Sequence, residues 1–177
     1  DIIQGPVYFA NIYNPVSVQY QEVDDLIVVS QSHSNSVLCF FDDSDLTLKW
    51  ALNSSVVKYY DNKLGSAYLM GNGNVLLGSP AVDTLDTGKL LVYNLSNGFI
   101  EKKLTFNNDV IKALPGTSTD YSTFYVLTDD VINNGENSRL HLVNTSGTII
   151  STWGDNNEIF HPKGMRVVSG DNILISE

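Results

Sequence analysis

Four short apolar runs recur along this chain: LIVVS at 26–30, VLLGS at 75–79, FYVLT at 124–128 and ILISE at 173–177. Their first residues, 26, 75, 124 and 173, are each 49 positions apart. A repeat of roughly 40 to 50 residues made of short strands is typical of a β-propeller or a similar array, because each unit buries its apolar faces against its neighbours. The spacing therefore predicts one strand-built unit that repeats along the chain.

The sequence around each run predicts the other strands of that unit. Most of the runs follow a short turn rich in Gly, Asn or Asp, residues that tolerate the positive φ of tight hairpins. The predicted first strands lie at 16–20, 66–69, 111–114 and 165–168, the third strands at 36–40, 88–93 and 138–143, and the outer strands at 46–50, 99–106 and 148–153. Four strands joined by hairpins form one propeller blade. The predicted fold class is therefore all-β, a β-propeller of four-stranded antiparallel blades, with blades at 15–53, 64–106 and 110–153 and a half-blade at 160–177.

About three and a half blades are fewer than most propellers contain, because these rings close with about four to eight. Three interpretations follow: a piece of a larger propeller, a small four-bladed ring completed by a further strand near 5–13, or an open stack paired with neighbouring subunits. Between the blades we expect a buried layer, with aromatic residues packing further out. The expected buried positions are Val28, Leu76, Val126 and Ile175, and the expected outer ones are Phe40, Tyr93 and Trp153.

One segment also resembles a known repeat family. Residues 160–177 read FHPKGMRVVSGDNILISE, which is similar to the opening half of an NHL repeat: an aromatic residue, Pro, Gly, an apolar strand, a Gly-Asn turn and a strand that ends on an acidic residue. Residues 14–40 resemble a degenerate copy, and the middle repeats depart further. The resemblance implies a propeller fold and no particular activity, since propellers host unrelated functions.

Composition limits the classes of partner. The 177 residues include 20 acidic and 10 basic side chains, for a net charge of −10. Binding to nucleic-acid phosphates needs clustered Lys and Arg, so we expect no nucleic-acid partner. No apolar run approaches the roughly 18 residues that span a bilayer, so we expect no membrane insertion. The chain begins at Asp1, which suggests a processed or partial N-terminus, and the single Cys39 lies in an apolar run as an expected buried thiol.

The loops after the second strands hold the candidate metal ligands. These carboxylates are Asp83, Asp86, Asp129, Asp130 and Glu136. Carboxylate oxygens from neighbouring loops suit Ca²⁺, which takes six to eight oxygen ligands. The loop at 129–136 lacks the acidic spacing of a known calcium loop, so solvated turn residues are the competing interpretation and no cofactor is expected.

Catalysis has little support in the sequence. The three histidines, His33, His141 and His161, do not recur at equivalent repeat positions, although some NHL-type lyases hold zinc with several central histidines. The chain has no Gly-x-Ser-x-Gly, His-Glu-x-x-His or Cys-x-x-Cys motif. The enzyme assignment is left open with a leaning towards none. The alternative is a lactonase- or lyase-like propeller with a central divalent cation.

Three tripeptides match the N-glycosylation acceptor motif, beginning at Asn53, Asn94 and Asn144. Asn94 and Asn144 fall in the same turn of successive repeats, which favours an extracellular or secreted protein. The unpaired Cys39 favours a cytoplasmic one instead. The sequence thus predicts a non-catalytic binding or structural module that contacts a protein partner or neighbouring subunits, with a subunit of an extracellular filament or virion as a further alternative.

Overall fold

The computed structural model describes residues 2–4, 15–21, 24–31, 38–52, 66–79, 88–97, 99–116, 121–130, 135–154, 158–168 and 172–177. Within these ranges the chain is all-β, with no helix. The described residues accordingly contain no helix of the length and apolar character needed to cross a membrane. The prediction of an all-β fold is confirmed.

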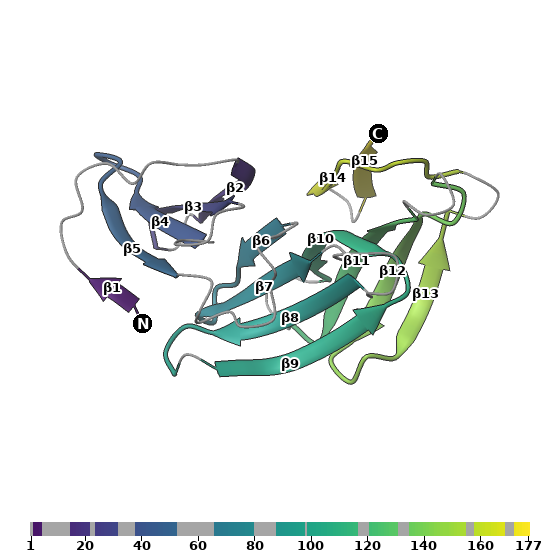
Figure 1. The fold of residues 1–177 in the computed structure, drawn as a ribbon, viewed down its shortest axis with the longest axis horizontal. Coiled ribbons are helices and arrows are strands. Elements are labelled where there is room, and N and C mark those ends of the chain that lie inside the picture. The colour runs from purple at the N-terminus through teal and green to yellow at the C-terminus, as the bar shows by residue number, and fades with distance from the viewer. Residues whose placement is uncertain are drawn as a thin grey trace.

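The strands form four antiparallel sheets in chain order (Figure 1). Sheet 1 contains β1 (Ile2–Gln4), β2 (Pro15–Gln21), β3 (Leu26–Gln31), β4 (Leu38–Asp42) and β5 (Leu48–Leu52). Sheet 2 contains β6 (Ser66–Leu69), β7 (Asn74–Ser79), β8 (Gly88–Asn94) and β9 (Phe99–Phe106). Sheet 3 contains β10 (Asp109–Pro115), β11 (Thr123–Asp129), β12 (Arg139–Asn144) and β13 (Ile149–Trp153), and sheet 4 contains β14 (Gly164–Val168) and β15 (Asn172–Ser176). Every predicted strand from 16 to 177 therefore has a counterpart.

Sheet 1 differs from the other sheets because it has a fifth strand. β1 pairs antiparallel with β5, with Ile3 opposite Ala51. This N-terminal strand therefore extends the outer edge of the first sheet and does not complete the last one. The further strand expected near 5–13 lies outside the described residues.

The turn between the third and fourth strands has the same construction in sheets 1 to 3. The side-chain Oδ1 of Asp42, Asn94 or Asn144 accepts two hydrogen bonds from the serine two residues later, one from its backbone N–H and one from its Oγ–H. Such local bonds stabilise a turn without the need for glycine. Each hairpin also contains a bulge next to the turn, where the pairing skips Lys49, Glu101 or Ile150.

Three apolar clusters join neighbouring sheets. The first lies between sheets 1 and 2 and includes Val28, Phe40 and Leu77. The second lies between sheets 2 and 3 around Leu76 and Val126, and the third joins sheet 3 to sheet 4 through Leu127 and Met165. The stabilising core is therefore distributed between the sheets, as expected when repeated units bury their faces against one another.

The predicted burial is correct for three of the four positions on the second strands and wrong for two of the three positions expected further out. Val28, Leu76 and Val126 are buried, whereas Ile175 in the two-stranded sheet 4 is half-buried. Phe40 and Tyr93, which we expected to pack further out, are among the largest fully buried side chains. Trp153 is 46% exposed because it lies on the outer strand β13. Aromatic character alone does not indicate how far a residue lies from the edge of a sheet.

The four sheets fan out as an open arc (Figure 1). The first strands of the sheets, β2, β6, β10 and β14, lie along the concave side of this arc, and the outer strands β5, β9 and β13 lie on the convex side. One strand from each sheet consequently faces a common central space.

Candidate functional site

The central space contains a cavity of about 780 Å³. Its walls come from all four first strands, β2, β6, β10 and β14, with Pro115 and Gly116 at the end of β10. Ligand sites of small molecules usually occupy cavities of roughly 300 to 1,000 Å³. The cavity thus has the size of a ligand site and lies where four sheets converge.

Four residues at equivalent strand positions line this cavity. Tyr20, Tyr68, Leu114 and Arg166 each pair across their hairpin with the second residue of one of the repeated apolar runs, namely Ile27, Leu76, Tyr125 and Leu174. They therefore form one tier around the cavity, with one member from each sheet. The tier combines two phenol rings, an aliphatic side chain and a guanidinium group.

The charged side chains that line the cavity are both cations. Lys112 and Arg166 contribute an ammonium and a guanidinium group, and no Asp, Glu or His lies among the lining residues described. Burial lowers the pKa of the half-buried Lys112 from its ordinary value of 10.5. Burial also raises the pKa of Tyr68, which keeps its phenol neutral and able to donate a hydrogen bond. The cavity is therefore electropositive within a strongly acidic chain.

Side chains of sheet 1 form hydrogen bonds with the backbone of β6, the edge strand of sheet 2 beside the cavity. Gln19 accepts a hydrogen bond from the backbone N–H of Leu69 at 2.7 Å and donates one to its carbonyl at 3.2 Å. The backbone N–H of Ala67 donates to Ser17 Oγ at 3.3 Å. An edge strand exposes unpaired backbone groups that otherwise need another strand or water. These contacts hold sheets 1 and 2 in a fixed relation at the cavity wall.

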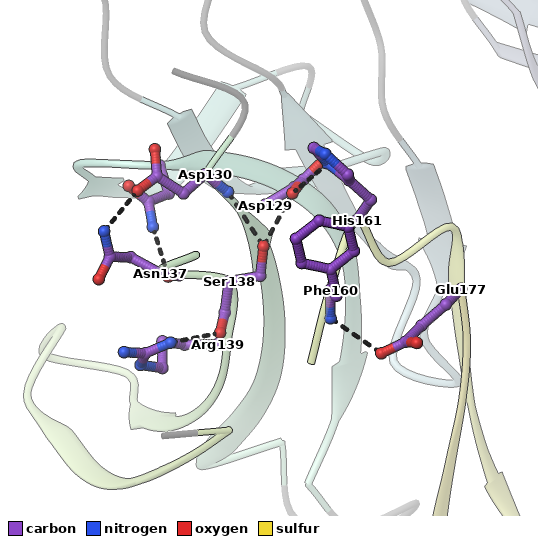
Figure 2. A network of polar contacts seen from close by, with 9 residues as sticks. Asp129, Asp130, Asn137, Ser138, Arg139, Phe160, His161 and Glu177 are labelled. Atoms are coloured by element: carbon purple, nitrogen blue, oxygen red, sulfur yellow. Dashed lines mark hydrogen bonds and ion pairs between the residues drawn. The ribbon is translucent and has the colours of Figure 1, made fainter. Parts of the chain in front are cut away.

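The predicted acidic ligands in the loop after β11 take part in a polar network at the junction of sheets 3 and 4 (Figure 2). Asp129 and Asp130 are each only 4% exposed. Asp129 Oδ1 accepts a hydrogen bond from Ser138 Oγ at 2.8 Å, and Asp130 Oδ2 accepts one from Asn137 Nδ2, also at 2.8 Å. Glu136 is exposed, and its backbone carbonyl accepts a hydrogen bond from Arg139. The two aspartates are thus engaged in closing their own loop.

His161 links this network to the segment that enters sheet 4. Its Nδ1 lies 3.4 Å from Asp129 Oδ2, and its ring packs edge-on against Phe160 with the ring centroids 4.6 Å apart. The backbone N–H of Phe160 donates to Glu177 Oε1 at 2.8 Å. The aromatic residue and the strand-end acid of the segment at 160–177 are therefore joined by a direct hydrogen bond.

Ser138, Asp129 and His161 are the residue types of a hydrolase triad, but their arrangement differs from one. In a triad the serine donates to the histidine, and the histidine donates to the carboxylate. Here the hydroxyl of Ser138 donates to Asp129 and accepts a hydrogen bond from the backbone N–H of Asp130, at 3.2 Å. Ser138 is fully buried. The arrangement closes a loop and does not activate a nucleophile.

The remaining predicted metal ligands, Asp83 and Asp86, lie outside the described residues. Among the residues that the structure describes, no three His, Cys, Asp or Glu side chains come together as a set that could hold a metal ion. His141 is also separate from His161: it lies on β12, stacks on Phe106 and contacts Thr152 Oγ1 at 3.0 Å. The structure thus places the two described histidines in different environments.

Two of the three glycosylation candidates are described, and both form the repeated turn. Asn94 also donates from Nδ2, the atom that would carry a glycan, to Glu101 Oε1 at 2.7 Å. No described residue accepts a hydrogen bond from Asn144 Nδ2. Asp42 forms the same turn in sheet 1, where no glycan could be attached, so the turn geometry alone accounts for an Asn or Asp at this position. Asn53 lies outside the described residues.

No family model matches the sequence, and no curated protein matches it. Among solved structures, the chain is similar to the β-propeller domain of Myceliophteria thermophila Cps50 (Swd1), with a TM-score of 0.56, 10% identity, and coverage of 98% of this chain and 64% of that one. These four sheets are β-propeller blades.

Two further solved structures are similar over most of the chain. One is the extracellular domain of a protein described as a hybrid two component system of B. thetaiotaomicron, with a TM-score of 0.49, 15% identity, and coverage of 90% of this chain and 18% of that one. The other is Kuenenia stuttgartiensis hydrazine synthase, with a TM-score of 0.46, 11% identity, and coverage of 93% and 54%. The chain therefore spans less than two thirds of each of the three structures.

Proposed function

We propose that this chain is a non-catalytic binding module, a segment of a larger propeller of NHL-like repeats that contacts other proteins. The observation that supports it is a pair of unpaired sheet faces at the two ends of the arc. Each interior sheet face packs against a neighbour through an apolar cluster. The two outermost faces present apolar side chains of the same kind to solvent.

The first end face belongs to sheet 1. Residues 18 and 20 of β2 lie on one side of the strand, because side chains alternate between the two faces of a sheet. Val16 lies at a bulge, where the pairing with β3 skips it. Val16, Val18 and Tyr20 are all exposed, with Val18 at 67%. The alternate residues Ser17 and Gln19 contact sheet 2 instead. The first end face is therefore an exposed apolar stripe, and its residues Val18 and Tyr20 also border the central cavity.

The second end face belongs to sheet 4. Leu174 on β15 is 63% exposed, and its cross-strand partner Arg166 is exposed beside it. Ile173 and Ile175 point to the other side and pack against the cluster shared with sheet 3. Sheet 4 also has two strands where sheets 2 and 3 have four. Both its outer face and its open edge have the form of surfaces that another sheet covers.

The occupant that we assign to both faces is a further four-stranded blade. The interior clusters show what covers such a face in this molecule, namely the apolar face of the next sheet. The charged residues differ between the two end faces. Asp25 and Asp43 lie beside Tyr20 and raise its pKa further than burial alone does, whereas Arg166 lies on the other end face. An assembly of chains joined end to end, as in a filament or virion, is the alternative occupant.

Native mass spectrometry of the protein as isolated from its source tests this proposal. We expect a polypeptide well above 19.5 kDa, the mass of these 177 residues, because further blades belong to the same ring. A polypeptide of 19.5 kDa that forms oligomers would identify a second copy as the occupant and overturn the larger ring. A 19.5 kDa monomer would contradict both.

Paired variants locate the contact. Val18→Asp places a charge on the first end face and should lower the stability of the ring or the association of subunits. Phe99→Asp is the matched control, because Phe99 is 71% exposed on the outer strand β9 and lies on neither end face. Equal effects of the two substitutions on stability and association would contradict a role for the end face.

We also propose an extracellular location, supported by the acceptor motifs. Asn144 is the strongest acceptor candidate, because its turn is exposed and no described residue engages its Nδ2. Intact mass before and after enzymatic deglycosylation tests the assignment. Hexose-containing mass that disappears in Asn144→Asp would support it, and an unglycosylated protein from the native source would overturn it.

A further inference from the structure

The two cations of the central cavity have no counter-charge in the described structure. No described residue forms a hydrogen bond or an ion pair with the ammonium of Lys112 or with the guanidinium of Arg166. Two other cations do have partners: Lys49 lies 2.7 Å from Asp42 on the surface, and Arg139 donates to the carbonyls of Ser138 and Gly154. Lys112 is half-buried, which distinguishes it from an exposed cation such as Lys102.

An unpaired cation at a partly buried position is costly. Removing an ammonium group from water disfavours its charged form unless a partner or hydrogen bonds compensate. Most of the chain's ionisable groups are acidic, 20 against 10 basic ones, yet no carboxylate lines this cavity in the described residues. The carboxylates of Asp25 and Asp43 lie beside the hydroxyl of Tyr20 but are not among the residues that line the cavity.

The rest of the lining is suited to an organic body. Tyr20, Tyr68 and Leu114 belong to the same tier as Arg166 and offer two aromatic rings and an aliphatic side chain. The neutral phenol of Tyr68 forms no hydrogen bond with a described residue and is available as a donor. Gln19, by contrast, uses both polar atoms of its amide in hydrogen bonds with the backbone of Leu69. The free groups of the cavity are therefore donors and cations, together with apolar surface.

From this arrangement we propose that the central cavity binds a small organic anion, a carboxylate or phosphate carried on an apolar or aromatic body. Lys112 and Arg166 bind the anionic group from β10 and β14, and the tyrosines of β2 and β6 pack on its body. The site shares Tyr20 and Arg166 with the two end faces and lies at their central edge, on the concave side of the arc. It also differs from the central divalent-cation site considered above, because its ligands would repel a metal ion.

Phenyl phosphate is a suitable probe for the whole protein. We expect binding that can be measured by calorimetry or NMR titration, weakens with added salt as exposed charge interactions do, and perturbs the amides of the four first strands. Benzyl alcohol, which matches the ring and lacks the charge, should bind at least about tenfold more weakly. Equal affinity for the neutral compound would overturn the proposal, and so would binding of inorganic phosphate as tight as that of phenyl phosphate, because the tyrosines would then have no role.

Charge variants test the two cations. Lys112→Gln and Arg166→Gln should each weaken phenyl phosphate binding about tenfold, whereas Lys112→Arg should retain most of it. Lys102→Gln is the matched control, since Lys102 is an exposed cation on the outer strand β9. Thermal unfolding of each variant confirms that it folds, and Lys112→Arg provides a conservative variant if Lys112→Gln does not. Unchanged affinity in both cavity variants, or an equal loss in the control, would overturn the assignment.

Discussion

Leu76 and Leu174 are equivalent residues in sheets 2 and 4, and their environments are opposite. Each is the second residue of a repeated apolar run, and each pairs across its hairpin with a residue of the central tier. Leu76 is 1% exposed and Leu174 is 63% exposed. Sheet 2 has a neighbour on both faces, whereas sheet 4 has one described neighbour. The difference shows that the next sheet, and not the strand's own sequence, buries a residue in this architecture.

Truncation of the two leucines should produce the largest contrast. Leu76→Ala removes a side chain from the cluster between sheets 2 and 3 and leaves a cavity there. We expect a loss of about 2–5 kcal/mol in the free energy of unfolding, measured by chemical denaturation. Leu174→Ala in the 177-residue chain should change this free energy by less than about 0.5 kcal/mol, as surface substitutions do.

The same pair sharpens the proposal of further blades. In the intact native protein, a blade on the second end face would cover Leu174, and Leu174→Ala should then become clearly destabilising. If Leu174→Ala stays neutral in both the short chain and the native protein, that face is a true surface. If Leu76→Ala is also neutral, the sheets do not pack as described.

The repeated strands could be predicted because each depends on short-range signals. An apolar run and a turn residue are both readable within about ten positions, and the fixed spacing relates one unit to the next. The depth of burial could not be read in the same way. Phe40 and Trp153 both lie beyond the second strand, but Phe40 packs between two sheets and Trp153 lies on an outer edge. Only the positions of neighbouring sheets distinguish them.

Disruption of the polar network at the junction of sheets 3 and 4 should have the next largest effect on stability. Ser138→Ala leaves the carboxylate of Asp129 without its 2.8 Å donor and the backbone N–H of Asp130 without its acceptor, both at buried positions. We expect a loss of about 1–3 kcal/mol in the free energy of unfolding. Hydrogen exchange should show the loss most strongly at residues 158–177, because Asp129 also contacts His161. Ser96→Ala, in an exposed turn of sheet 2, is the control, and an equal effect there would contradict a special role for this junction.

The central cavity was not predictable from any motif. Lys112 and Arg166 lie 54 positions apart on different sheets, and neither belongs to a recognisable pattern. Alignment of the repeats by their cross-strand partners, rather than by the runs alone, does reveal the signal. It places Arg166 where the other sheets carry Tyr20, Tyr68 and Leu114, so a single charged residue interrupts an apolar tier. The acidic loop residues are easier to single out, because carboxylates at turns are conspicuous in a sequence.

The turn between the third and fourth strands recurs in sheets 1 to 3, and its disruption should have a smaller effect on stability. Asn144→Ala removes an acceptor used by Ser146 and by the backbone of Thr148, so we expect a loss of about 1 kcal/mol. Asn144→Asp keeps the acceptor oxygen, as Asp42 does in sheet 1, and should be nearly neutral in the unglycosylated chain. Thermal unfolding distinguishes the two. If Asn144→Asp is as destabilising as Asn144→Ala, the oxygen is not what stabilises the turn.

The smallest expected effect concerns pH and the interface between sheets 2 and 3. His141 stacks on Phe106, and burial, with a contribution from Arg139, lowers its pKa below the usual 6.5. The unfolded chain therefore takes up a proton at a higher pH than the folded protein does, so acidification through about pH 6.5 favours unfolding at this residue. The melting temperature should fall between about pH 7.5 and about pH 5.5, and less steeply in His141→Gln, which cannot take up the proton. Identical pH slopes for the two proteins would mean that His141 is solvated in the folded state. The inter-sheet face would then be wetter at β12 than at Leu76, and burial by the neighbouring sheet would be incomplete even in the interior of the arc.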